Sequence, residues 1–205
     1  MTKNKEPNRS YRQSVRAEGA QETGEAILKA ARELTTEKWL DELTLDDIAE
    51  RAGVAVRTVF RRFGTRDDLI TAMVDKYRAE LESGERKPPL PGEVAKAIAM
   101  LVESYERQGA YNLRGLAQES RWPFIRDMFD HARARHRRFV EQVFALDLEG
   151  LPNEIKQQRT AQLEVATWMT TWKYFRIDLA LSKTKTEAAL LDLVKAITTR
   201  ELPSI

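Results

Sequence analysis

A run of arginines between positions 51 and 66 is the part of the sequence best suited to bind another molecule. It holds Arg51, Arg57, Arg61, Arg62 and Arg66 and no acidic residue, although the whole chain balances 34 basic against 32 acidic residues. Guanidinium groups bind phosphate as charged forks and can bond two acceptors on the major-groove edge of guanine. The local charge therefore indicates a nucleic-acid surface; the plainer alternative is a solvated basic helix.

Two short helices are predicted around these arginines. Each has four apolar residues at i, i+3, i+4 and i+7, which is the spacing of one helix face. They are Leu45, Ile48, Ala49 and Ala52 in the first helix and Val56, Val59, Phe60 and Phe63 in the second. This spacing leaves Arg57, Thr58, Arg61 and Arg62 together on the opposite face of the second helix.

The ends of the two helices carry matching signals. Thr44 stands three residues before Asp47, so its hydroxyl can accept from a free backbone N–H while Asp47 adds negative charge at the positive end of the dipole. Gly53 stands where a left-handed residue would make a sharp corner. Thr65 and Asp68 repeat the capping pattern for a further helix, whose start could hold a phosphate. A helix-turn-helix that reads duplex DNA is therefore predicted, with its reading unit at about 44–63.

The chain from residue 27 to about residue 81 resembles the TetR family of bacterial transcriptional regulators. The resemblance is carried by ILKAARELTTEKWLDELTLDDIAERAGVAVRTVFRRFGTRDDLI, with AERAGV at the turn and an aromatic-x-x-Phe-Gly before the next helix. It implies that one face of the second helix contacts bases or phosphates, and that a residue near the start of each flanking helix holds the DNA backbone. The residues so implied are Thr44, Arg57, Thr58, Arg61, Arg62 and Arg66.

Several positions depart from the family pattern. Phe60 stands where a tyrosine that bonds a phosphate is common, so it can pack but cannot make that bond. Arg62 stands where histidine or tyrosine is frequent, and its permanent charge is expected to restore part of the lost attraction. Ala55 replaces a common capping serine, and Trp39 replaces a glycine that usually ends the first helix. We expect the last two to change local geometry and not the fold.

Composition divides the chain into four segments. Residues 1–20 are basic and poor in apolar groups, which predicts a disordered tail; the alternative is an arm that reaches the DNA minor groove. Residues 21–84 form the predicted DNA-binding domain. Three prolines in four residues mark a junction at 85–92. Residues 93–205 are predicted to form a helical regulatory and dimerisation domain.

The second domain shows helical periodicity only, so the predicted fold class is all-α. Its helices are expected near 94–105, from 123 to 143, from 154 to about 181, and near 190–197. The helix from residue 154 is apolar over a wide arc, so it must be covered by its own core, by a symmetric partner, or by both. The resemblance implies a dimer seam on the final two helices. We therefore expect a homodimer that selects a palindromic operator.

Aromatic side chains are concentrated in the second domain, which holds three of the four tryptophans. The plainer interpretation is an ordinary aromatic core. The resemblance implies instead that a small, often apolar or aromatic effector binds between the middle helices. The residues predicted to line its pocket are Leu101, Tyr105, Phe124, Met128, Trp168 and Trp172.

Other classes of function have little support. The chain has no cysteine and none of the nucleophile, zinc or phosphate-loop motifs of common enzymes, so neither catalysis nor a cofactor is expected. His131 and His136, five apart among arginines, are interpreted as surface residues and not as a metal pair. The sequence shows no secretory signal and no apolar run of membrane-spanning length, which favours a cytoplasmic protein without membrane contact.

These patterns together predict a transcriptional regulator, most simply a homodimeric repressor that a small ligand releases from its operator. The alternative keeps DNA binding but gives the second domain only dimerisation or a protein partner.

Overall fold

The computed structural model describes residues 9–83 and 89–199, and these contain helices and no strand. The chain forms two compact units, Met1–Glu80 and Leu81–Ile205. The predicted all-α class is confirmed. The division falls within the last turns of α4, a few residues before the junction predicted at 85–92; positions 84–88 of the chain lie outside the described residues.

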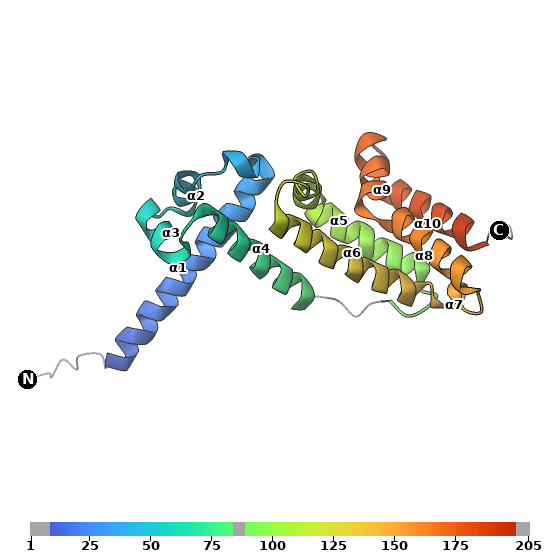
Figure 1. Ribbon diagram of the computed structural model, residues 1–205, viewed down its shortest axis with the longest axis horizontal. Helices are drawn as coiled ribbons and strands as arrows, with labels where there is room; N and C mark the ends of the chain where they lie inside the picture. Colours follow the sequence, from blue (N-terminus) through green and yellow to red (C-terminus); the bar gives the residue numbers. More distant parts are fainter. Residues whose placement is uncertain (1–8, 84–88, 200–205) are drawn as a thin grey trace, which may run out of the picture. The chain divides into compact units, whose positions relative to one another are not determined.

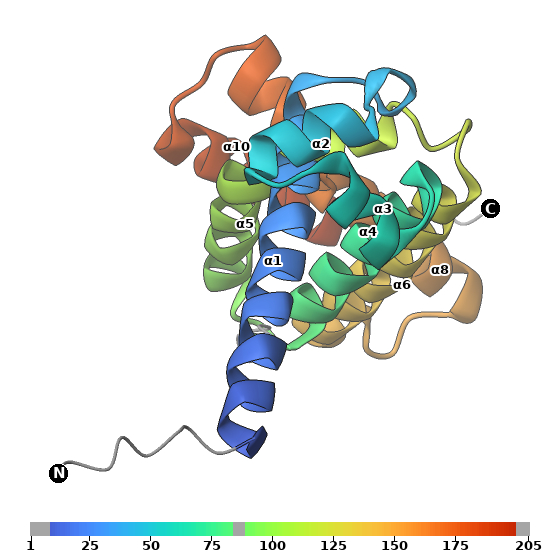
Figure 2. The same ribbon diagram turned by 90° about the vertical axis from the view of Figure 1, so that its left-hand side faces the viewer.

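The first unit is built on a long helix against which three shorter ones pack (Figures 1 and 2). Its elements are α1 (Arg9–Glu37), the 3-10 turn η1 (Leu40–Glu42), α2 (Leu45–Ala52), α3 (Val56–Phe63) and α4 (Arg66–Ser83). Each helix contributes fully buried side chains to one core, among them Ile27, Ile48, Val59 and Leu69. This shared apolar core fixes α3 on the surface of the unit.

Helix α1 begins at Arg9, so residues 9–20 are helical and not the disordered tail that the composition predicts. Residues 1–8 lie outside the described residues. The buried turns of α1 near Ile27 and Leu34 supply a helical nucleus. Extending a helix from a nucleus adds one hydrogen bond per residue without a new nucleation cost, and alanine, glutamine and glutamate favour the helix. A charged composition opposes burial in a core, but it does not oppose helix formation.

Reciprocal capping holds the start of α2, as predicted. The Thr44 hydroxyl accepts from the Asp47 backbone N–H at 3.1 Å, and the Thr44 N–H donates to Asp47 Oδ2 at 3.0 Å. Lys38 Nζ donates to Asp47 Oδ1 at 2.6 Å. The Lys38 bond, followed by the two bonds from Thr44, lowers the pKa of Asp47 from 3.8 to about 2. One carboxylate thus joins the start of α2 to the chain that follows α1.

The corner after α2 also has the predicted geometry. Gly53 is left-handed, with φ 67° and ψ 33°, and its N–H bonds the Ala49 and Glu50 carbonyls. Thr65 and Asp68 form a second reciprocal pair at the start of α4, with 3.0 Å from the Thr65 N–H to Asp68 Oδ2. The sequence signals for the two helix starts and the corner are therefore confirmed.

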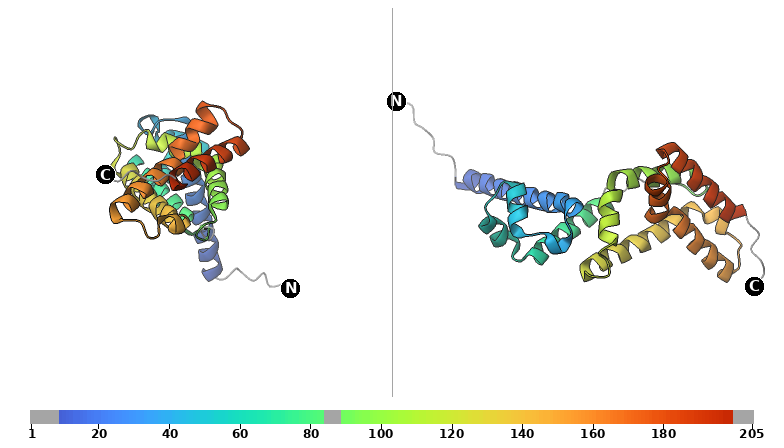
Figure 3. Two further views of the ribbon diagram at one scale, coloured as in Figure 1. Left: turned by 90° about the vertical axis from the view of Figure 1, so that its right-hand side faces the viewer. Right: turned by 90° about the horizontal axis from the view of Figure 1, so that it is seen from above.

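The second unit is a bundle in which α5 packs against α6, α9 and α10, and α8 packs against α6 and α10 (Figure 3). Its elements are α5 (Val94–Leu116), α6 (Pro123–Val143), α7 (Ala145–Leu148), α8 (Asn153–Thr167), α9 (Met169–Lys173), the π-helix η2 (Tyr174–Asp178) and α10 (Lys183–Thr199). Pro123 begins α6 as predicted. The core includes Ile98, Phe129, Leu163 and Leu190.

The long helix predicted from 154 to about 181 is broken at Trp168, whose backbone is extended with φ −73° and ψ 156°. The Val165 carbonyl, which would meet the Met169 N–H in a continuous helix, accepts instead from the Thr171 hydroxyl at 2.6 Å and from the Trp168 N–H at 3.3 Å. Threonine hydroxyls offer the backbone such local alternatives to the helix. The break gives Trp168 and Trp172 separate surroundings, which periodicity alone could not show.

The interpretation of both histidines as surface residues is wrong for His136, which is only 8% exposed. Its Nε2 lies 2.9 Å from the Thr167 hydroxyl oxygen, and its ring meets the Trp168 ring edge-on at 5.0 Å between centroids. His131 is exposed. Burial lowers the pKa of His136 from 6.5 to about 4. The ring is therefore neutral at pH 7 and acts as part of the interface between α6 and α8.

We predict that folding stability falls as the pH decreases from about 6.5 to about 4. In this window the unfolded chain binds a proton at His136 and the folded chain does not, so acid favours unfolding, by roughly 3 kcal/mol over the full window. Urea unfolding at a series of pH values measures the effect. His136→Gln should flatten the dependence, whereas His131→Gln should leave it unchanged; equal pH profiles for His136→Gln and the wild type would contradict the prediction.

We also predict that Thr44→Ala destabilises the first unit by about 1 kcal/mol, because a backbone N–H at the start of α2 loses its cap. Thr44→Ser keeps a hydroxyl at the same place and should retain most of the stability. Thermal unfolding of the two variants beside the wild type makes the comparison. A Thr44→Ser variant as unstable as Thr44→Ala would mean that the threonine acts through its methyl group.

Candidate nucleic-acid interface

Helix α3 presents opposite chemistry on its two faces. Val59 is fully buried, and Val56 and Phe63 are half-buried against the rest of the first unit. Phe60 is 60% exposed, so its predicted place in the buried stripe is wrong. It falls at the edge of the apolar stripe next to the arginines, and an eight-residue helix buries only the centre of such a stripe.

The five arginines fall into two groups. Arg51 is paired with Glu37 at 2.7 Å and approaches Glu33 at 3.8 Å, so it fastens α2 to α1. Arg66 bonds Asp67 through Nε and Nη2, and its Nη1 donates to the Leu40 carbonyl at 3.1 Å. Both guanidinium groups are used in holding the first unit together.

Arg57, Arg61 and Arg62 form the second group. All three are exposed on α3, and within residues 9–83 and 89–199 none has an ion pair with a carboxylate. The Arg62 guanidinium lies 5.9 Å from the centre of the Phe63 ring. Thr58 lies half-buried on the same helix. The outward side of α3 therefore carries positive charge that the neighbouring protein does not neutralise.

Four of the six residues predicted to contact DNA thus lie together on α3, and the remaining two are engaged elsewhere. The Thr44 hydroxyl donates to Asp47 Oδ2 at 2.8 Å as well as capping α2. Arg66 is held at the start of α4 by Asp67 and Leu40. Both residues mark helix starts, where backbone N–H groups point outward and attract anions.

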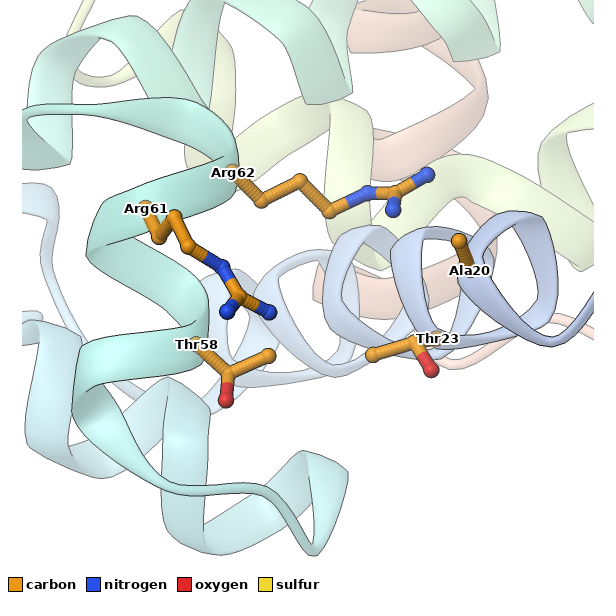
Figure 4. A pocket seen from close by; sticks show the side chains of 5 residues that line it. All are labelled: Ala20, Thr23, Thr58, Arg61 and Arg62. Atoms are coloured by element: carbon orange, nitrogen blue, oxygen red, sulfur yellow. The ribbon is translucent and has the colours of Figure 1, made fainter. Parts of the chain in front are cut away.

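A groove of about 310 Å³ lies between α3 and α1 (Figure 4). Its lining residues are Ala20, Thr23, Thr58, Arg61 and Arg62. Figure 4 shows both arginine side chains extending from α3 toward α1. The contribution of α1 is not predicted from the sequence, because the composition of residues 1–20 indicates a tail. A signal for it is nevertheless present in Gly24, an unusual residue so close to the buried turns of a helix.

The six residues predicted to line an effector pocket fall into two groups in the second unit, and Leu101, half-buried on α5 one turn before Tyr105, belongs to the first of them. Tyr105 and Trp172 stack at 5.7 Å, the Tyr105 hydroxyl donates to the Thr167 carbonyl at 2.9 Å, and Trp172 Nε1 donates to Glu106 at 3.2 Å. Trp168 contacts His136 nearby.

Phe124 and Met128 belong to the other group. Phe124 meets Trp122 at 5.8 Å between ring centres, and Met128 reaches the backbone of α5 at Gly115. Ten residues separate Tyr105 from Gly115 along α5, which is about 15 Å at the rise of an α-helix. The two groups of side chains therefore lie about three turns of α5 apart.

The described part of the chain contains neither a metal site nor a membrane-spanning helix. No group of three or more histidine, aspartate or glutamate side chains there could hold a metal ion. Among the described residues, no helix has both the length and the apolarity needed to cross a membrane.

Comparison with known proteins agrees with the geometry of the first unit. Residues 27–73 match the family model for bacterial regulatory proteins of the tetR family. The HTH-type transcriptional repressor Rv3405c of Mycobacterium tuberculosis is 29% identical over 126 residues, covering 58% of this chain and 63% of the relative. The chain thus matches less than two thirds of that relative's length.

Solved structures support the fold of both units and not of the first alone. A transcriptional regulator from Aquifex aeolicus VF5 has a TM-score of 0.60 at 17% identity, covering 85% of this chain and 99% of that one. The flavonoid-responsive regulator FrrA has a TM-score of 0.56 at 18% identity, with 86% and 95% covered. With the capped helix-turn-helix and its basic outer face, the match over residues 27–73 shows that the first unit carries the helix-turn-helix DNA-binding domain of the tetR family of bacterial regulatory proteins.

Proposed function

We propose that this protein is a sequence-specific repressor that binds a palindromic operator as a homodimer and is released by a small apolar or aromatic ligand. One observation carries the DNA-reading part: Arg57, Arg61 and Arg62 lie exposed on α3 without a described carboxylate partner, while Arg51 and Arg66 are paired. Such guanidinium groups suit phosphates and guanine edges. Thr58 adds a hydroxyl on the same helix.

In this proposal Thr44 and Arg66 act mainly by holding the starts of α2 and α4. The backbone N–H groups at those starts then receive DNA phosphates, which position the protein without specifying sequence. The protein would act in the cytoplasm, where a bacterial promoter is found.

The homodimer is supported by apolar side chains that the second unit leaves exposed. Val165 on α8 and Tyr174, Ile177 and Leu179 beyond α9 are 49 to 69% exposed. Large apolar side chains gathered in one short stretch favour a covering partner. A symmetric partner uses the same surface twice and sets two copies of α3 at a fixed spacing, which selects an inverted repeat.

Repression and ligand release rest on different support. A relative with 29% identity is named a repressor, and occupation of a promoter by a dimer is the simplest means. In this proposal the ligand is bound by the aromatic side chains of Tyr105, Trp168 and Trp172, beside which Glu106 and His136 are polar neighbours. A ligand there must bind the DNA-incompetent arrangement more tightly, since only differential affinity shifts an equilibrium.

A second candidate has its own observation. The Tyr105 hydroxyl and the Trp172 indole N–H are already bonded to protein groups, and their rings stack on each other. This satisfied arrangement favours a purely structural aromatic core. The second unit would then only dimerise or bind a protein partner, with DNA binding unchanged.

Selection from a random duplex pool by the full-length protein tests the central proposal. We expect the retained sequences to contain an inverted repeat with half-sites about one helical turn, or a multiple of it, apart. Enrichment of a single unrepeated half-site would contradict the dimer. No enrichment over the starting pool would contradict sequence-specific binding.

We predict that Arg57→Ala and Arg61→Ala weaken binding to the selected duplex. A loss confined to that duplex, worth roughly 1–3 kcal/mol, would identify a base contact, and an equal loss on all sequences would identify a phosphate contact. Fluorescence anisotropy with both kinds of duplex measures the difference. Arg137→Ala, an exposed arginine of the second unit paired with Glu141 and Glu164, is the matched control and should bind as the wild type.

For the effector, we predict that an apolar aromatic compound changes tryptophan fluorescence and lowers operator affinity. Trp172→Phe should remove much of the fluorescence response, while Trp122→Phe should retain it, because only the former residue belongs to the group with Tyr105 and Trp168. A chemically diverse set of compounds that changes neither signal would support the structural core instead.

A further inference from the structure

Gly24 lies in the interior of α1, directly beneath the side chain of Arg62. It is buried, although a turn earlier α1 is largely exposed. A Cβ atom at this position would overlap Nε, Nη2 and Cζ of Arg62. The guanidinium plane thus occupies space that any other residue at position 24 would fill.

Glycine is otherwise a poor choice at this position. Its φ is helical, so no left-handed conformation requires it. In a helix interior only proline is less favourable. Gly19, one and a half turns earlier in the same helix, is a glycine without this constraint, because a Cβ atom there would have no heavy atom within 4 Å. The contrast assigns Gly24 a role in accommodating Arg62.

The groove beside Gly24 has the chemistry of an anion site. Arg61 and Arg62 reach into it from α3, Ala20 and Thr23 close it from α1, and no carboxylate lines it (Figure 4). The Thr23 hydroxyl donates its proton to the Gly19 carbonyl at 2.7 Å, so the donors left facing the groove come from α3. Two guanidinium groups that line the same groove repel each other, and a shared phosphate would offset that repulsion.

We propose that Gly24, which lacks a Cβ atom, leaves the space in which the Arg62 guanidinium lies. We propose further that Arg62 and Arg61 together bind one backbone phosphate of DNA in the groove between α1 and α3. The proposal rests on the proposed DNA-binding function and extends its interface to α1. The contact replaces the phosphate bond that Phe60, without a hydroxyl, cannot make. Gly24 is a positioning residue that touches no DNA itself.

Full-length wild type and the variants Gly24→Ala, Arg62→Ala and Gly19→Ala test the proposal. The probe is a fluorescein-labelled mixed-sequence duplex of about 30 base pairs, roughly three helical turns. Affinity is measured over a series of salt concentrations. Gly24→Ala and Arg62→Ala should each bind about three- to tenfold more weakly, with a slope of log affinity against log salt smaller by about 0.9, the value for one phosphate contact.

Two controls separate this effect from folding. Gly19→Ala gains the same helix propensity without meeting Arg62, so it should bind as the wild type. Gly24→Ala should melt at or above the wild-type temperature, because the clash involves the free end of a flexible side chain. The double variant Gly24→Ala/Arg62→Ala should bind no more weakly than Arg62→Ala alone.

Several results would overturn the proposal. A Gly24→Ala variant with wild-type affinity and slope would show that DNA binding does not need the space left by Gly24. Additive losses in the double variant would show that the effect of Gly24 does not depend on Arg62. If Gly24→Ala fails to fold, Arg62→Ala decides, and an unchanged slope there rejects the phosphate contact. A wild type that binds no duplex would reject the proposed function and this inference with it.

Discussion

The carboxylate of Asp47 fixes how the first unit presents its third helix. It accepts from Lys38, just beyond α1, and from Thr44 at the start of α2, while the Asp47 backbone N–H donates to the Thr44 hydroxyl. Because α3 follows α2 through the single left-handed residue Gly53, any freedom at the start of α2 would be carried to α3. Arg51 repeats the restraint at the other end of α2 by its pairing with Glu37. A short helix that buries little surface is thereby held in one orientation.

The five arginines between positions 51 and 66 carry the same charge but have two different roles. Arg51 and Arg66 connect elements that are distant in sequence, and their positive charge is balanced inside the unit. Arg57, Arg61 and Arg62 share a helix on which the sequence supplies no acidic residue. The net charge of the whole chain, +2, hides this local division.

Local signals in the sequence predicted local structure well. The caps at Thr44 and Thr65, the corner at Gly53 and the start of α6 at Pro123 each depend on a few neighbouring residues, so spacing was enough. The break at Trp168 depends on which donors the Val165 carbonyl accepts from, and apolar periodicity does not record that choice, so the prediction continued the helix through it. His136 was visible in principle, because it shares a stripe with Phe129, Val140 and Val143; its neighbouring arginines pointed the other way. The groove against α1 required two segments forty residues apart to meet.

The glycine beneath Arg62 has a consequence for anyone who would engineer this protein. A ranking of substitutions by predicted thermostability would place alanine at position 24 near the top, since an interior helical glycine is a standard target for replacement. The same substitution would displace the Arg62 guanidinium. A Cβ atom at position 24 would thus raise the stability of the fold and lower its affinity for DNA, so a more stable protein obtained in this way would be a poorer regulator.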